Sequence, residues 1–561
     1  MNYYLKIIYY KFTPTFIPWS VSHRPEQCPV ETQVMEQKPT RAMSCGDTGH
    51  GAEIANPLLI TDKYLLINVK CLLFTVYCSL FAVCCKAQFS PELKRAFTEI
   101  RELKIGTGRQ ILAKEKARNI PSDGFDVYIE NYANIVSLLI SDDPVLYAQT
   151  ADNEEIRLNV LKKISDKLPQ KRFFQAEVRL HWAFVKLKFG KQYSASWDII
   201  KAYKLLDENA RLFPDFQPTY KSLGLLHVLI GSTPQNYKWV ADLLGLKGNI
   251  QQGLKEIQMV SGNPNSIFRT EAQQIELLIQ ANITKYTDKS NADLLALVKS
   301  QPDDLLMHFF GTIISMKDGR SEQALRLLDS RPRGNQYYPF PFTDYLKAEI
   351  SLEKSQYAES EKYFKLFLSH YRGHNFVKDT YFKLYLCNWL TGNDLVAKNY
   401  INILLKSGQT VVEADEAAQK FAENYAKNQH SEPQKVLMKA RLAYNGGFLD
   451  EALKDLSPYN ETNFSQLPDK VEYQYRLGKI YQKLNQFDKA ISNYERALVL
   501  SEPLILYFGA TSALQLGYIY QSKNQRQRAI QYFQKALNYP KHEYKNSVDN
   551  KAKAALTAMG V

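Results

Sequence analysis

Cysteine is scarce over most of this 561-residue chain. Six of the seven cysteines fall in the opening part of the sequence: Cys28, Cys45, Cys71, Cys78, Cys84 and Cys85. Beyond them only Cys387 remains, within the apolar segment YFKLYLCNWL. The main body can therefore form neither an intramolecular disulfide nor a cysteine-based metal site. We expect Cys387 to be a small buried hydrophobe.

Glycine (25) and proline (23) are modest in number, whereas tyrosine (36) and phenylalanine (28) are abundant. This balance favours helical hairpins packed by aromatic side chains over a turn-rich sheet protein. The formal net charge of +13 is also not concentrated anywhere, because lysine and arginine are mixed with aspartate and glutamate and no run of five or six basic residues occurs. Nucleic-acid binding needs a clustered basic footprint, so we expect no nucleic-acid partner.

Motifs of catalysis and metal binding are missing as well. The sequence has no H-E-x-x-H, no G-x-S-x-G and no P-loop. His370 and His374 have the i,i+4 spacing of a metal pair, but Gly373 lies between them and no acidic partner is near. The lone G-x-G at Gly106 to Gly108 follows no strand, and close helix packing explains it better than a phosphate loop. We expect no enzymatic activity, no metal and no cofactor.

The longest apolar run, CLLFTVYCSLFAVCC, has only 15 residues. A membrane-spanning helix needs roughly 20. Lys63 and Lys70 precede the run, and small residues, Cys85 and Ala87, stand at the −3 and −1 positions before Gln88. These features predict a secretory signal peptide over residues 63–87. If residues 64–85 are retained instead, they would serve as a membrane anchor.

Residues 1–62 mix aromatic, proline and polar residues without a helical or strand period. They are typical of a disordered extension. Since signal peptides belong at the N-terminus, the extension also suggests a start-site misassignment, with the true start just upstream of Val69. Export would place the mature protein in the periplasm or cell envelope of a bacterium, which suits a main body with one cysteine.

Two segments near the end of the chain repeat each other. They read VEYQYRLGKIYQKLNQFDKAISNYERAL and ATSALQLGYIYQSKNQRQRAIQYFQKAL. The matching residues are Leu477 and Leu516, Gly478 and Gly517, Tyr481 and Tyr520, Ala490 and Ala529, Tyr494 and Phe533, and Ala497 and Ala536. This pattern resembles the tetratricopeptide repeat family. We expect Gly478 and Ala490 to lie where two antiparallel helices touch, and Tyr481, Tyr494 and Ala497 to fill the space between hairpins.

The repeat period differs from that of the family. Gly478 and Gly517 are 39 positions apart, whereas the family period is about 34. We place the extra residues in a longer loop between the two repeats, around Ser501–Phe508.

Helical periodicity extends over the rest of the chain from Ser90 onward. The resemblance therefore implies an all-α fold, a right-handed α-solenoid of helix-turn-helix repeats. We divide it into an N-terminal helical-repeat region (88–270), degenerate repeats (271–465), and two clear repeats with a C-terminal capping helix (466–561). The capping helix is expected at Val548–Met559.

Residues 216–253 have a character of their own. Their sequence of helix, G-x-x-P, aromatic residue and G-x-x-G turn resembles the inclusion-body-clearance family of tetratricopeptide proteins. Gly245, Gly248 and Gly253 are expected to permit sharp turns and close contacts. Tyr237 and Trp239 either pack in the core or line a small-ligand pocket.

The family resemblance also implies a binding surface, because the first helix of each hairpin lines a concave groove that receives a partner segment. Carried onto this sequence, the groove positions are Tyr475, Lys479, Gln482, Lys483, Leu514, Tyr518, Gln521 and Ser522. None is asparagine, which argues against the family's clamp for acidic C-terminal peptides. Solvated helix faces are the alternative interpretation.

We therefore predict a non-enzymatic protein–protein interaction scaffold, exported to the cell envelope, that binds a protein or peptide segment in its groove. The alternative is an envelope protein that binds a carbohydrate or small molecule through an aromatic pocket near Tyr237 and Trp239.

Overall fold

The structure is a computed structural model, and it describes residues 89–119, 121–233, 241, 244–427, 431–502, 504, 506–540, 542 and 544–561. The predicted extension (1–62) and signal peptide (63–87) lie outside the described residues, as do Tyr237 and Trp239. The described residues from Pro91 to the C-terminus belong to one unit. Within them, none of the helices combines the length and apolarity needed to cross a membrane.

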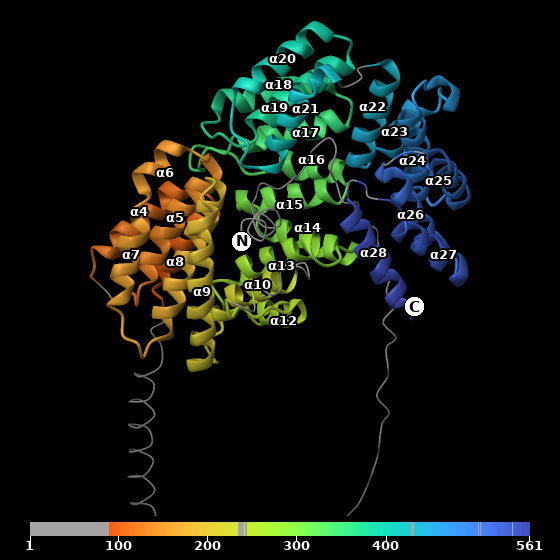
Figure 1. Ribbon diagram of the computed structural model, residues 1–561. Helices are drawn as coiled ribbons and strands as arrows, with labels where there is room; N and C mark the ends of the chain where they lie inside the picture. The colour runs from red at the N-terminus through yellow and green to blue at the C-terminus, as the bar shows by residue number, and fades with distance from the viewer. Residues whose placement is uncertain are drawn as a thin grey trace, which may run out of the picture. The chain divides into compact units, whose positions relative to one another are not determined.

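Helices build the first part of this unit (Figure 1). Their bounds are α3 (Pro91–Arg101), α4 (Ile105–Lys116), α5 (Phe125–Ser141), α6 (Pro144–Thr150), α7 (Asn153–Lys162), α8 (Pro169–Lys188), α9 (Gln192–Leu212) and α10 (Pro218–Gly231). Four of them begin with proline, which lacks the N–H that a first turn would leave unbonded.

The middle of the chain continues in the same way. Its helices are α12 (Ile250–Ser261), α13 (Arg269–Asn282), α14 (Asp288–Ser300), α15 (Leu305–Lys317), α16 (Ser321–Asp329), α17 (Phe342–Glu353), α18 (Tyr357–His370), α19 (Val377–Leu390), α20 (Asp394–Lys406), α21 (Glu413–Glu423) and the short 3-10 helix η2 (Tyr425–Lys427). Asn249, Thr287 and Asp304 cap α12, α14 and α15 by accepting backbone N–H bonds.

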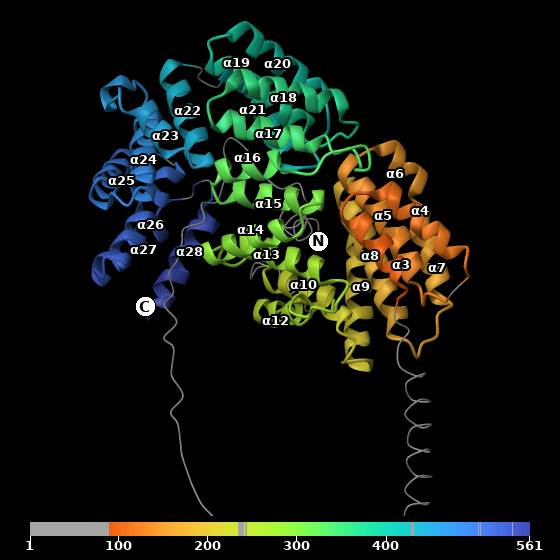
Figure 2. The same cartoon turned by 180° about the vertical axis from the view of Figure 1, so that it is seen from behind.

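The last part contains the two clear repeats, seen from the other side in Figure 2. Its elements are α22 (Glu432–Gly446), α23 (Leu449–Leu456), η3 (Glu461–Asn463), α24 (Leu467–Lys483), α25 (Phe487–Ser501), α26 (Tyr507–Ser522), α27 (Arg526–Leu537) and α28 (Lys545–Ala558). The helix α28 covers the predicted capping segment and packs against both helices of the last hairpin.

The predicted all-α helical-repeat fold is confirmed. The described part of the chain has no strand, and most consecutive helices pack in pairs as hairpins. The pairs are α8 and α9, α10 and α12, α15 and α16, α17 and α18, α19 and α20, α22 and α23, α24 and α25, and α26 and α27. The right-handed sense of the solenoid stays a prediction.

Glycines allow helices α10 and α12 to pack closely, as the sequence predicted for residues 216–253. A Cβ added at Gly224 would lie 2.6 Å from the carbonyl oxygen of Gly253, so the two backbones touch. Gly245 has a φ of +71°, which side-chain-bearing residues rarely adopt, and it supports the predicted sharp turn.

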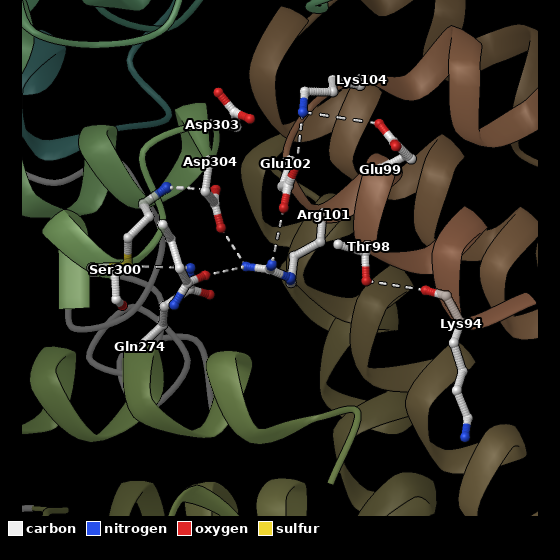
Figure 3. Close-up of polar contacts among 12 residues, drawn as sticks. Lys94, Thr98, Glu99, Arg101, Glu102, Lys104, Gln274, Ser300, Asp303 and Asp304 are labelled. Carbon is white, nitrogen blue, oxygen red and sulfur yellow. Dashed lines mark hydrogen bonds and ion pairs between the residues drawn. The ribbon is translucent and has the colours of Figure 1, made fainter. Parts of the chain in front are cut away.

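Buried polar contacts also join segments far apart in sequence. Arg101, at the end of α3, pairs with Asp304, the N-cap of α15, and donates a hydrogen bond of 3.0 Å to Gln301 (Figure 3). Nearby, the backbone N–H of Tyr338 donates to the carbonyl of Leu103 at 2.8 Å. In an ideal repeat array each unit contacts only its neighbours, so these contacts depart from that pattern.

A second long-range connection involves Asp142, which follows α5. Its carboxylate accepts hydrogen bonds from the Tyr371 hydroxyl at 2.6 Å and from the Asn375 backbone at 3.3 Å. The Asn375 side chain also donates to the carbonyl of Lys188, at the end of α8. Burial raises the pKa of Asp142, and these donors and Lys188 oppose that rise. The first hairpins therefore pack against residues 301–376.

Cys387 is buried in α19, with an exposed fraction of 1%, as predicted. Burial raises the pKa of its thiol to about 12. Since the thiolate is the reactive species, we expect native Cys387 to resist iodoacetamide at pH 8 and to react at once in denaturant. Mass spectrometry of alkylated Cys387 peptides checks this, and rapid labelling of the native protein would contradict the burial.

Candidate functional site

The two C-terminal hairpins pack closely at the glycines of the repeated pattern. A Cβ added at Gly478 of α24 would lie 2.7 Å from the ring of Tyr494 in α25. The same approach recurs one hairpin later, where a Cβ at Gly517 would lie 2.5 Å from the ring of Phe533 in α27. The small side chains of the pattern are fully buried at Ala490, Ala497, Ala529 and Ala536. The shared sequence pattern therefore has a shared geometry.

Leucine and tyrosine of the pattern face the preceding hairpin. Leu477 and the half-buried Tyr481 pack with Val436 and Leu437 of α22 in one apolar cluster. In the following repeat, Leu516 and Tyr520 have exposed fractions of 0% and 6%. Because α25 ends at Ser501 and α26 begins at Tyr507, the extra residues of the long repeat fall between the two hairpins.

The predicted groove residues lie in three different settings. Tyr475 and Tyr518 are buried, and Leu514 is buried beside them, so these side chains pack in the interior, unlike the expected groove contacts. Gln482 is half-buried and links neighbouring helices: it donates to Gln515 of α26 at 3.0 Å and accepts from the Tyr494 hydroxyl at 2.7 Å.

The remaining predicted groove residues are closer to solvent. Lys479 and Gln521 are half-buried, whereas Lys483 and Ser522 are exposed. Lys479 and Lys483 lie one helical turn apart on α24, so they share one face of it.

Positive charge and aromatic rings gather on α22 and α24. The ammonium of Lys479 lies 4.2 Å from the ring centre of Tyr444 and 5.8 Å from that of Tyr475. Arg441 of α22 and Arg476 of α24 lie close enough to influence each other's ionisation. We call Arg441, Tyr444, Tyr475, Arg476 and Lys479 the cation–aromatic cluster.

The electrostatics of the cation–aromatic cluster favour negative charge. Burial, reinforced by Arg476, lowers the pKa of Arg441. Burial alone would lower the pKa of Arg476, but Glu472, which accepts from its Nε at 2.7 Å, raises it above the ordinary value. Arg441, Arg476 and Lys479 bring three cations into this cluster, and a carboxylate from outside would relieve repulsion among them.

Sequence reasoning missed Arg441 and Tyr444. They belong to a degenerate repeat, and the groove positions were taken from the two clear repeats alone. The sequence did hold a signal for them. Arg441 and Tyr444 are three positions apart, just before Gly446–Gly447, and this spacing places both side chains on one face of α22.

A separate group of buried charges surrounds Lys221 of α10. Its ammonium donates to Glu177 of α8 at 2.7 Å and to Glu271 of α13 at 3.2 Å. Burial alone would lower the pKa of Lys221, but the two carboxylates raise it. Ser222 also donates to Glu177. This buried triad of Glu177, Lys221 and Glu271 joins helices α8, α10 and α13.

His181 lies beside the buried triad and is neutral. Asn131 accepts from Arg157 and Trp182 through its side-chain oxygen, so its amide nitrogen donates to His181 Nδ1 at 3.1 Å. The ring proton therefore sits on Nε2, which faces Glu177 at 3.8 Å. Burial, helped by the charge of Lys221, lowers the pKa of His181 to about 3.

The lowered pKa of His181 predicts a pH-dependent stability. Below pH 6.5 His181 is protonated in the unfolded chain but stays neutral in the folded one. The contribution of His181 to the free energy of unfolding is therefore fully present above pH 6.5 and is lost as the pH falls toward 3. Between pH 7 and pH 5 this loss reaches about 2 kcal/mol for one such group. Urea denaturation of wild type and His181→Gln at both pH values checks it. An equal pH dependence in the two proteins would contradict the buried, neutral state.

Comparison with known proteins defines the class of the C-terminal hairpins. Residues 468–541 match a family model described as tetratricopeptide repeat. The segment contains both α24–α25 and α26–α27. No curated protein sequence gives a match. The resemblance of residues 216–253 to the inclusion-body-clearance family stays a prediction.

Three solved structures are similar to this chain. The crystal structure of the P58(IPK) TPR domain is 13% identical, with 77% of this chain and 98% of that chain covered and a TM-score of 0.20. A monomeric mutant of IFIT1 with Gppp-AAAA is 13% identical, with coverages of 84% and 95% and a TM-score of 0.28. The APC/C hetero-tetramer Cut9–Hcn1 is 14% identical, with coverages of 81% and 87% and a TM-score of 0.20.

Tetratricopeptide repeats generally bind proteins or peptides, without catalysis. The repeat fold therefore suggests a protein–protein interaction scaffold.

Proposed function

We propose that this protein is an exported, non-enzymatic scaffold whose C-terminal hairpins bind an acidic segment of a partner protein. The observation that supports it is the cation–aromatic cluster on α22 and α24, next to the tandem tetratricopeptide hairpins. The three cations of this cluster attract negative charge, and its tyrosine rings add amphipathic contact area.

The partner segment contacts α24 through Lys479 and Lys483. Both lie on one face of this helix, and Lys483 is exposed. Charges at the solvent-exposed edge of an interface act mainly on the rate of association and on its salt dependence. Binding of the partner should therefore weaken as the ionic strength rises.

Charge reversal tests the proposed binding face. Lys483→Glu should reduce co-purification of the partner from envelope extracts. Lys535→Glu on α27 is the matched control, because Lys535 is also exposed and lies outside the cluster. Equal recovery of the same partner by both variants and by wild type would refute the assignment of this face.

Export is tested separately. We propose that residues 63–87 are removed as a signal peptide, so that the mature protein begins at Gln88. N-terminal sequencing of the natural protein should return the sequence QFSPEL. Peptides from residues 1–60 in the natural protein would contradict both the start-site proposal and cleavage.

The alternative function, binding of a carbohydrate or small molecule near Tyr237 and Trp239, stays a prediction, because both residues lie outside the described part of the chain.

A further inference from the structure

A cavity of about 240 Å³ lies where the first hairpins meet the middle of the chain. Helices α5, α8, α10, α13 and α15 contribute to its wall, together with residues just before α17 and α19. It lies near the long-range contacts of Asp142 and Arg101 described above. It is therefore bordered by the segments whose packing departs from a simple repeat array.

The cavity is large enough for a small molecule. An engineered apolar cavity of about 150 Å³ binds benzene, so the larger volume here has room for a small molecule with one aromatic ring.

Most of the wall is apolar, and much of it is aromatic. Phe309 of α15 lies 4.7 Å from Phe340, and Phe342 lies 4.9 Å from Phe376, measured between ring centres. All four line the cavity, and Phe184 of α8 lines it too. This part of the wall suits the apolar or aromatic body of a ligand.

The polar part of the wall is the buried triad. Glu177, Lys221 and Glu271 all line the cavity, and their exposed fractions are 1%, 3% and 7%. Two carboxylates face one ammonium there, and the neighbouring His181 is neutral, so this end carries one net negative charge.

The other cations near the cavity have carboxylate partners of their own. Lys188 also lines the wall and lies 4.0 Å from the Asp142 carboxylate. Arg101, which does not line the cavity, contacts both Asp304 and Glu102. The excess negative charge of the triad is therefore not offset by these neighbours, and in a poorly hydrated site a ligand cation would offset it. Aromatic rings stabilise the same kind of group.

We propose that this cavity binds a small amine: a ligand with an aromatic or aliphatic body among the phenylalanines and one ammonium group toward Glu177 and Glu271. A carboxylic acid of the same size is excluded by repulsion from the triad. This site goes beyond the proposed partner binding and is independent of it, since it lies on other helices and its test needs no partner.

Calorimetric titration of the full chain tests the ligand class with three probes of matched shape: phenethylamine, phenethyl alcohol and phenylacetate. We expect phenethylamine to bind with one-to-one stoichiometry, about tenfold or more tighter than the alcohol. Phenylacetate should give no heat of binding. Absence of phenethylamine binding at millimolar concentration overturns the proposal, as does equal or tighter binding of the alcohol or the acid.

A conservative variant tests the site. Glu271→Gln keeps the shape of the side chain and an acceptor for Lys221, but it removes the excess charge. We expect it to weaken phenethylamine binding about tenfold and to leave phenethyl alcohol unchanged. Glu276→Gln is the control on the same helix, because its carboxylate accepts from Gln258 and Ser261 and does not line the cavity. An equal loss in both variants, or no loss in Glu271→Gln, overturns the assignment.

Discussion

Replacing Lys221 by methionine should lower the free energy of unfolding by about 3–5 kcal/mol. The substitution keeps the apolar stem but removes the ammonium that bonds both Glu177 and Glu271. Both carboxylates are almost fully buried, so they would be left as uncompensated charges or would have to take up protons. Urea denaturation at pH 7 measures the loss.

Two further variants test whether the loss of stability is specific to the buried triad. Lys289→Met removes an exposed lysine that lies 2.7 Å from Asp293, and it should leave the free energy of unfolding nearly unchanged. Adding Glu177→Gln and Glu271→Gln to Lys221→Met should restore part of the lost stability, because the orphaned charges disappear. A loss below about 1 kcal/mol in Lys221→Met would mean that water reaches the triad.

Replacing Gly517 by alanine should lower the free energy of unfolding by about 1–3 kcal/mol. Alanine is normally the better helix former, but its Cβ would lie 2.5 Å from the ring of Phe533, which is fully buried. The α26 and α27 helices would be pushed apart. Hydrogen exchange should therefore quicken in this hairpin more than elsewhere.

Gly106→Ala is the matched control for Gly517→Ala. Gly106 lies in α4, and an added Cβ would meet no atom within 4 Å. Stability should stay the same or rise by up to about 1 kcal/mol. If the two substitutions have equal effects, close helix packing is not the reason for glycine at position 517.

The sequence predicted the repeat architecture because its signals are local. The Leu-Gly-x-x-Tyr pattern at Leu477 and Leu516 places small and aromatic residues at fixed helical spacings, and the structure forms a hairpin at each. The inter-repeat loop near Ser501 followed from counting residues between Gly478 and Gly517. Such arguments need no knowledge of distant contacts.

The long-range features could not be predicted in this way. Nothing near Arg101 in sequence indicates that it pairs with Asp304, because the pairing depends on how successive hairpins are placed in space. The same holds for Lys221, whose two partners lie on α8 and α13. Burial of Tyr475 and Tyr518 also differs from the groove positions that the family resemblance implies.

The central claim, that a partner binds the face formed by α22 and α24, is tested most directly by site-specific photo-cross-linking. A photoreactive residue would replace Lys483 on α24 in one protein and Lys535 on α27 in another, both at exposed positions. The account predicts that position 483 captures one partner through an acidic segment and that position 535 does not capture it. Capture of the same partner equally from both positions, or from position 535 alone, would contradict the account.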